Sequence, residues 1–188
     1  MDATLGSLFS IGHSNHSIER FLDLVAQNDI QIVADVRSSP WSKYSPWFNK
    51  DDLNNALETR GVRYVFLGQE LGGRPADEHL YDDQGYALYD RFLEMDYVQR
   101  GLARLMSLIE EGHRVAVLCS EEDPRECHRH RLIAWEMDRS FGIVALHIRG
   151  DGSVESELDL RRKDQPGLFD ADEEMNMPPR SAKRIQTK

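Results

Sequence analysis

Residues 115–129 read Val-Ala-Val-Leu-Cys-Ser-Glu-Glu-Asp-Pro-Arg-Glu-Cys-His-Arg, and this stretch decides the fold class. Its first five residues form an apolar run with the length of a buried strand. The following Asp123–Glu126 is a capping box with proline at the first helical position, which predicts the start of a helix. A buried strand that leads into a helix is the repeating unit of a parallel sheet.

The same alternation extends outward from this stretch in both directions. The pattern predicts strands over residues 7–11, 30–36, 62–67, 115–119 and 144–148. It predicts helices that follow Ser17, span residues 50–60 and 88–111, and run from Asp123 to Gly142. Alternating strands and helices imply right-handed crossovers with helices on both faces of the sheet. We therefore expect an α/β, Rossmann-like three-layer fold with a mostly parallel sheet of about five strands.

Length and composition fit one domain followed by a tail. The chain has 188 residues, 40% of them hydrophobic, which is enough for a packed core but short for two full domains. From Lys163 onward the composition shifts to acidic residues, then to Pro178-Pro179 and a basic end, as is typical of disorder. We expect a single α/β domain over residues 1–162 and a flexible C-terminal tail over residues 163–188.

Charge and hydropathy restrict the environment of the protein. The 33 acidic and 23 basic residues give a net charge of −10, which argues against strong direct binding of nucleic acid by bulk electrostatics. No apolar run approaches the ~20 residues that a membrane span needs, and the first residues lack the pattern of a signal peptide. We expect a cytoplasmic protein with no membrane partner. The two cysteines are expected as thiols rather than as a disulfide framework.

Candidate site residues concentrate at one edge of the predicted sheet. Ligands of parallel α/β sheets bind beyond the carboxyl ends of the strands, so this concentration predicts a functional pocket. The candidates are His13 and Ser14 after the first strand, Asp35, Arg37 and Ser38 after the second, Cys119 and Glu121 after the fourth, and Cys127, His128 and Arg129 on the next helix.

Cys127 is the stronger candidate nucleophile of the two cysteines. It is predicted in the first turn of a helix, next to His128 and Arg129, where the helix dipole and the cations lower the pKa of a thiol. Alternatively, Cys127 is a small residue packed in the core without a catalytic role. Cys119 lies at the end of a buried strand, and it too is either a reactive thiol or a structural residue.

Two other uses of the cysteines fit the sequence less well. Cys119 and Arg125 have the C-x5-R spacing of phosphatases, but three acids and a proline lie between them. The acids would repel phosphate and raise the thiol pKa, and proline removes one cradling amide. The C-x7-C-H-x-H arrangement is not a standard zinc spacing, so we expect no metal and no cofactor.

Two further features have both a functional and a structural interpretation. Asp35 and Arg37 face the same side of a strand end, where they form either an ion pair or a site for a base, a ribose or an anion. The aromatic segment 41–49, interleaved with Lys43 and followed by Lys50, either stacks on bases or covers the edge of the sheet.

These motifs together resemble one protein family. They are Ile11–Ser14, Asp35–Pro40, Leu67-Gly68 with Leu71–Gly73, and Leu118–Glu121 with Cys127–Arg129. In this order they resemble the domain-of-unknown-function 488 family over residues 8–150. The resemblance implies an α/β Rossmann-like domain whose motif residues gather at one end of the sheet. It implies no particular reaction, so the function has to be argued from the residues.

The first functional hypothesis is a cysteine-dependent hydrolase or transferase that acts on a nucleotide, nucleobase or nucleic-acid-derived substrate. Cys127 or Cys119 is the nucleophile, and His128 or His13 is the base. Glu121 is a general acid or base, and Arg37 and Arg129 bind an anionic group. The alternative is a binding module that uses the same pocket without turnover.

The predicted tail contains a short peptide that resembles a docking motif for a partner protein. Gln165, Leu168 and Phe169 are spaced as in the Gln-x-x-Leu-Phe peptides with which bacterial DNA-processing proteins dock on the sliding clamp. The alternative is that Leu168 and Phe169 fold back onto the domain. Clamp docking would bring an acidic protein to DNA without a basic surface.

Overall fold

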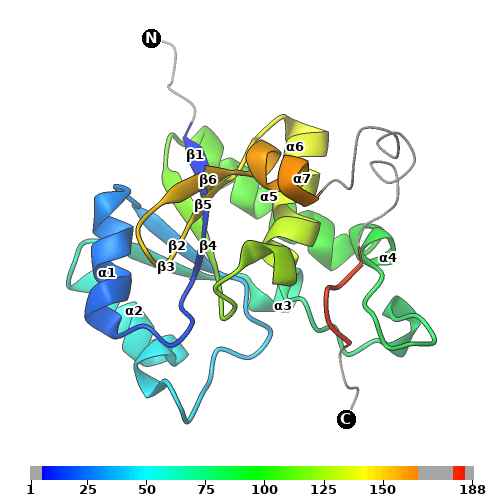
Figure 1. The fold of residues 1–188 in the computed structure, drawn as a ribbon, viewed down its shortest axis with the longest axis horizontal. Coiled ribbons are helices and arrows are strands. Elements are labelled where there is room, and N and C mark those ends of the chain that lie inside the picture. The colour runs from blue at the N-terminus through cyan, green and yellow to red at the C-terminus, as the bar shows by residue number, and fades with distance from the viewer. Residues whose placement is uncertain (1–5, 165–179, 185–188) are drawn as a thin grey trace.

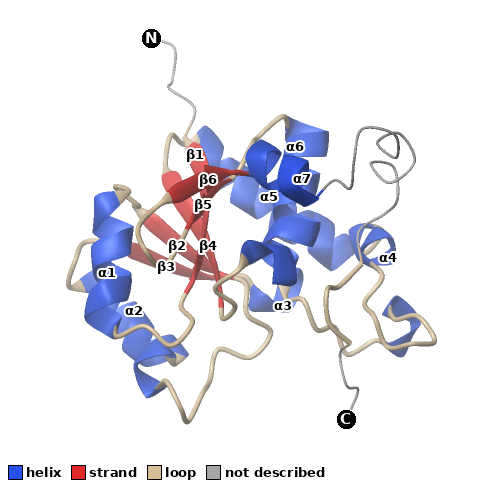
Figure 2. Ribbon diagram, viewed as in Figure 1, coloured by secondary structure: helices blue, strands red, loops and turns tan. Residues whose placement is uncertain are grey.

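A six-stranded sheet forms the centre of the molecule (Figures 1 and 2), in a computed structural model that describes residues 6–164 and 180–184. The strand order is β3-β2-β4-β1-β5-β6. Strands β1 to β5 run parallel to one another, and β6 runs antiparallel to β5. Their bounds are Ser7–Gly12 (β1), Ile32–Asp35 (β2), Arg63–Phe66 (β3), Arg114–Cys119 (β4), Leu146–Ile148 (β5) and Val154–Ser156 (β6). The predicted α/β fold with a mostly parallel sheet is confirmed, with a sixth strand beyond the five expected.

Helices cover both faces of this sheet (Figure 2). α1 (Ile18–Gln27) and α2 (Lys50–Glu58) pack on one face. The other face is covered by α3 (Gly68–Leu71), α4 (Tyr89–Leu93), α5 (Asp96–Glu110) and α6 (Trp135–Phe141), and α7 (Glu157–Asp164) follows β6. Among the described residues no helix is both long and apolar enough to pass through a membrane.

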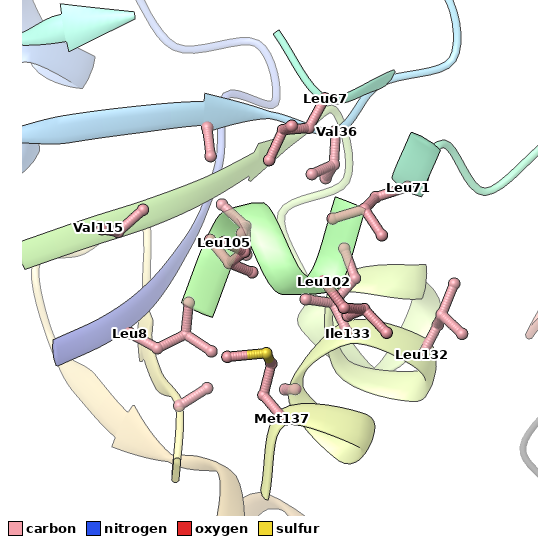
Figure 3. Packing of buried hydrophobic residues seen from close by; sticks show 14 of the residues in the cluster. Leu8, Val36, Leu67, Leu71, Leu102, Leu105, Val115, Leu132, Ile133 and Met137 are labelled. Carbon is pink, nitrogen blue, oxygen red and sulfur yellow. The ribbon is translucent and has the colours of Figure 1, made fainter. Parts of the chain in front are cut away.

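Each face of the sheet has its own hydrophobic core, and β4 contributes to both. Val115 and Val117 point into the core beneath α5 and α6, which also contains Leu102 and Ile133 (Figure 3). Ala116 and Leu118 point the other way, into the core beneath α1 and α2. Every position of β4 between its ends is therefore buried, which explains why its sequence is continuously apolar.

Two of the predicted helices differ from the structure. The helix predicted over residues 88–111 is broken, because Met95 is extended (φ −79°, ψ 129°) and separates α4 from α5. The capping box at Asp123 starts only a 3₁₀ turn, Pro124–Glu126, and Cys127 after it is extended (φ −131°, ψ 150°). A π-helical segment, Arg129–Ala134, then leads into α6. Placing Cys127 inside the first turn of a helix was therefore wrong, because this cysteine lies in the link before the helix.

The topology makes a crevice at the carboxyl ends of the central strands. The chain leaves β1 toward α1 on one face and leaves β4 toward α6 on the other, although β1 and β4 are neighbours. Such a switch point is where ligands bind in open α/β sheets. The loops after the two strands are in close contact here, since a Cβ on Gly12 would lie 1.9 Å from the carbonyl oxygen of Glu121.

The described residues 180–184 pack against the domain near α4 (Figure 1). Arg180 forms an antiparallel bridge with Leu88, and the amide of Ser181 donates to the carbonyl of Ala87 at 2.9 Å. This short segment belongs to the predicted tail, whose first residues, up to Asp164, form the end of α7. The contacts bring Lys183 to the rim of the crevice.

Candidate functional site

A pocket of about 560 Å³ opens at the carboxyl ends of β1, β2 and β4. Its wall combines residues from the loops after all three strands with the Gly73-Arg74 loop and the 180–184 segment. Of the predicted site residues, it brings together His13, Ser14, Arg37, Ser38, Cys119, Glu121, Cys127 and His128. Asp35 and Arg129 are not in the wall of this pocket.

Cys119, Cys127 and His128 form a compact group in this wall, which we call the thiol–imidazole centre. The Nδ1 atom of His128 lies 3.5 Å from the Sγ of Cys127 and 3.8 Å from the Sγ of Cys119. The Nε2 atom of His128 lies 3.0 Å from the carbonyl oxygen of Val36, to which it can only donate. In the neutral ring this bond leaves Nδ1 without a proton, so a base faces both sulfur atoms.

The two thiols of the centre differ in acidity. Burial of Cys127 would raise its pKa, but a hydrogen bond from Cys119 and the charges of His128 and Arg129 outweigh burial and hold the pKa well below its usual value. The pKa of Cys119 is raised, because this thiol donates its hydrogen bond to Cys127 and is itself buried. Of the two thiols, Cys127 is therefore the one that loses its proton more readily.

Arg129 supports Cys127 from behind the pocket. Its side chain is 0% exposed, with the backbone amide and Nε directed at the Cys127 sulfur, at 3.5 and 3.4 Å. Nη2 donates to the carbonyl of Glu121 at 2.5 Å, and Nη1 donates to the hydroxyl of Ser10 at 3.1 Å. The expectation that Arg129 binds an anionic group of the substrate does not fit this placement, because the donors named here face the interior.

A second titratable group lies on the other side of Arg129. His130 Nδ1 and His147 Nε2 both lie 2.8 Å from one carboxylate oxygen of Glu157, and we call these three residues the closed cluster. Accepting these two bonds outweighs burial and lowers the pKa of Glu157 to about 2. Burial lowers the pKa of His147, so this ring is neutral and its Nδ1 accepts from Ser10 at 2.7 Å.

Arg37 is held in place by a buried ion pair. Asp35 Oδ1 accepts from Arg37 Nε at 2.9 Å, and Oδ2 accepts from Arg37 Nη2 at 2.6 Å. The Tyr64 hydroxyl donates to the same Oδ2 at 2.7 Å, and Arg37 also donates to the carbonyl of Phe48. Asp35 is fully buried with both oxygens occupied, so it positions Arg37, while Arg37 itself lines the pocket.

His13 forms the opposite wall of the pocket in a neutral state. Its ring stacks on Phe48 at 4.4 Å between centroids, and its Nδ1 donates to the carbonyl of Ser14 at 2.8 Å. Burial, assisted by the charge of Arg37, lowers the pKa of His13 to about 4. Ser14 has a positive φ of 45°, an uncommon backbone conformation for a residue other than glycine, directly beside the pocket.

The rim of the pocket is charged on one side and aromatic on the other. Glu121, whose side chain is 42% exposed, pairs with Lys183 at 3.2 Å, and Lys183 also pairs with Glu126 at 2.7 Å. Glu121 therefore lies at the exposed rim of the pocket. Trp41 lines the pocket and is 68% exposed, and the neighbouring Tyr44 is 80% exposed, so these rings of segment 41–49 do not cover the sheet.

Sequence reasoning missed several residues that organise the site. They are Ser10, Tyr64, Tyr89, His147 and Glu157. Ser10 and His147 lie inside strands, and Glu157 follows β6, which the sequence pattern did not predict, so none of these three follows a predicted strand end. The one available signal was polarity inside an apolar run, as at Ser10 between Phe9 and Ile11.

Both titratable groups contain atoms that metals prefer. The ligand atoms of the thiol–imidazole centre all lie within 4.8 Å of one another, and so do those of the closed cluster.

The predicted clamp peptide, Gln165 to Phe169, lies outside the described residues.

Comparison with known proteins identifies the family but no further relative. The family model described as domain of unknown function DUF488 matches residues 17–135, more than half of the 188 residues. The match begins after the His13 motif, so it is narrower than the residues 8–150 expected from the motifs. No curated protein matches the chain, and no solved structure matches it. The match confirms the predicted resemblance: the chain belongs to the family described as domain of unknown function DUF488.

Proposed function

We propose that the protein is a cysteine-dependent enzyme that acts on a nucleotide, nucleobase or nucleic-acid-derived substrate. The observation that carries the proposal is the contact between Cys127 Sγ and His128 Nδ1, in a ring whose Nε2 is fixed by the carbonyl of Val36. Nucleophile, base and a third group that orients the base form the usual arrangement for covalent catalysis.

The chemistry follows from this geometry. The Cys127 proton passes to Nδ1 of His128, and the thiolate bonds to an electrophilic atom of the substrate as the leaving group departs. The leaving group takes the proton from Nδ1, which makes the ring neutral again. The neutral ring then deprotonates a water molecule, and the resulting hydroxide displaces the substrate fragment from Cys127. Arg129 stabilises the thiolate before attack and when it is released.

The wall of the pocket supports a substrate with an anionic part and a flat part. Arg37 and the exposed Arg74 both line the pocket, and guanidinium groups bind phosphates with directed hydrogen bonds. The exposed ring of Trp41 lies at the same rim, where it can stack on a base. The net charge of −10 does not oppose this substrate, because the cationic groups line the pocket itself.

Reactivity of the thiols tests the catalytic part of the proposal. In reduced protein stripped of metal ions, iodoacetamide should label Cys127 at neutral pH at least about tenfold faster than a model thiol. His128→Ala should slow that labelling, while His79→Ala, an exposed histidine outside the pocket, should not. Equal rates for Cys127 and the model thiol would remove the nucleophile from the proposal.

Protection by ligands tests the substrate class. Nucleoside monophosphates should slow the labelling of Cys127, and Arg74→Met should weaken this protection without changing the unprotected rate. Arg100→Met is the matched control, since Arg100 is exposed on α5 and does not line the pocket. The binding-module alternative predicts the same protection but an unactivated Cys127.

A further inference from the structure

We propose that the thiol–imidazole centre binds a zinc ion through the Sγ atoms of Cys119 and Cys127 and the Nδ1 atom of His128. The inference goes beyond the proposed function and does not depend on it. Metal binding needs only the positions and lone pairs of these three atoms, whereas the proposed enzyme needs Cys127 to be free to attack a substrate.

The two sulfur–nitrogen distances within the centre match a tetrahedral zinc site. Zinc–sulfur and zinc–nitrogen bonds of about 2.3 and 2.0–2.1 Å, at a tetrahedral angle, separate the sulfur and nitrogen ligands by about 3.6 Å. The observed separations from His128 Nδ1 are 3.5 Å to Cys127 and 3.8 Å to Cys119. The three ligand atoms lie within 4.8 Å of one another. An ion therefore fits between them with little rearrangement of the side chains.

The hydrogen bonds around the centre leave the required lone pairs free. Because His128 Nε2 donates to the carbonyl of Val36, Nδ1 is the atom available to an ion, and such a carbonyl is a usual outer-shell partner of a metal-bound histidine. Two N–H groups of Arg129 face the Cys127 sulfur and stabilise its negative charge. Gly73 packs over the imidazole, since a Cβ there would lie 2.8 Å from Nδ1, and this contact holds the ring in place.

The donor set selects the metal and leaves one position open. Two thiolates and an imidazole favour zinc over magnesium or calcium, which prefer oxygen ligands. Binding replaces the protons on the two sulfur atoms, so the ion and the two thiolates are neutral together. All three ligands line the pocket, so the fourth position of the ion faces it, as in zinc sites that bind water or substrate.

The closed cluster is a poorer site although it too gathers three ligands. His130 and His147 both lie 2.8 Å from the same Glu157 oxygen, closer than two ligands of one zinc ion, and both point N–H groups at it. The spacing of the ligands in the sequence did not indicate the thiol–imidazole centre. Cys127 has an extended backbone, and its sulfur atom lies near Nδ1 of the adjacent His128. Standard zinc motifs do not include two ligands on adjacent residues.

Cobalt binding to the full-length protein, reduced and stripped of metal ions, tests the inference. One equivalent of Co²⁺ should give a thiolate-to-cobalt charge-transfer band together with the visible bands of tetrahedral cobalt, and Zn²⁺ should abolish both. Cys119→Ser, Cys127→Ser and His128→Asn should each weaken zinc binding by more than about tenfold, the lower end of what losing an outer-shell partner costs. His79→Ala, which changes an exposed histidine outside the pocket, should bind as the wild type does.

A measurement on the unchanged protein covers the case in which a variant fails to fold. X-ray absorption of the zinc-loaded wild type should show two sulfur neighbours and one histidine nitrogen. A coordination shell without sulfur, or absence of the cobalt charge-transfer band, would overturn the zinc site. Rapid labelling of Cys127 in protein that binds no zinc would leave the proposed enzyme intact, whereas zinc binding with an unactivated Cys127 would leave only the metal site.

Discussion

The thiol–imidazole centre and the closed cluster each gather three titratable side chains, but their surroundings are opposite. The closed cluster lies within the interior, and its carboxylate accepts from both histidines and from Arg161. The thiol–imidazole centre lines a pocket, and its imidazole faces two sulfur atoms at distances longer than those of good hydrogen bonds. The carboxylate of the closed cluster is hydrogen-bonded within the protein, whereas the thiol–imidazole centre has lone pairs that a ligand in the pocket can use.

The comparison shows what distinguishes a structural cluster from a candidate site. Titratable residues gather in both places, so their gathering alone does not indicate function. The two groups differ in whether a ligand can reach them from the pocket and in whether their lone pairs are already used in hydrogen bonds. If this distinction is correct, changes to the closed cluster should mainly affect stability, and changes to the centre should mainly affect reactivity.

The largest effect is expected from Glu157→Gln. The change removes the charge that accepts N–H bonds from His130 and His147 and pairs with Arg161. Breaking such a buried pair should lower the free energy of unfolding by about 3–5 kcal/mol, measured by urea denaturation. Asp159→Asn, on the exposed side of the same helix, serves as the control and should cost less than about 1 kcal/mol. A near-neutral Glu157→Gln would contradict the comparison.

The next effect concerns pH and His13. The pKa of His13 falls from 6.5 in the unfolded chain to about 4 in the folded protein. Below pH 6.5 the unfolded chain takes up a proton that the folded protein does not, so stability is lost as the pH falls from 6.5 to 4. The shift corresponds to about 3 kcal/mol. His147, with its lowered pKa, adds in the same direction.

His13→Gln removes the first of these contributions. Its unfolding free energy should therefore change less between pH 7 and pH 4 than that of the wild type. Urea denaturation at several pH values measures the difference, and parallel pH profiles would show that His13 is not held neutral by the fold.

A smaller effect on stability, with a clear effect on reactivity, is expected from Gly73→Ala. The new methyl group would press on the His128 ring from 2.8 Å and displace Nδ1 from Cys127. Iodoacetamide labelling of Cys127 should slow by about tenfold, while the free energy of unfolding falls by only about 1–3 kcal/mol. Arg74→Ala, one residue later, changes the rim without touching the ring and should label at the wild-type rate.

The smallest effect on stability is expected from Lys183→Met. Lys183 is 56% exposed, so the loss of its ion pairs with Glu121 and Glu126 should change stability by no more than about 0.5 kcal/mol. Without these ion pairs residues 180–184 should pack less closely against the rim of the pocket. Iodoacetamide should therefore reach Cys127 more easily and label it a few-fold faster. An unchanged labelling rate would mean that residues 180–184 do not restrict access.

The strand pattern was sufficient to predict the core of the fold. β4 is apolar at each inner position because both faces are covered, and its sequence showed this directly. β6 was missed because Val154–Ser156 is a short, polar edge strand without an apolar run. The break at Met95 was missed because apolar residues continue on both sides of it, so the pattern resembles one helix.

The candidate site was predicted as a location but not as a network. The rule for strand ends found Arg37 and Cys119, which indeed lie in one pocket. It could not show that Arg129 turns inward, because this depends on Ser10 and on carbonyl groups of the 121–122 loop. It also treated Cys127 as helical, since the Asp123 capping signal gave no indication that the turn would end after three residues.

The position of β1 in the sheet has a consequence for how the protein is made. Of the six strands of the sheet β1 is synthesised first, yet Ser7 pairs with Arg114 on one side and Phe9 with Leu146 on the other. An apolar strand must therefore wait for more than a hundred residues of synthesis before it gains either neighbour. During that interval the nascent chain exposes a segment suited to pairing with other strands, and chaperones that bind extended apolar segments should find their preferred site at residues 7–12.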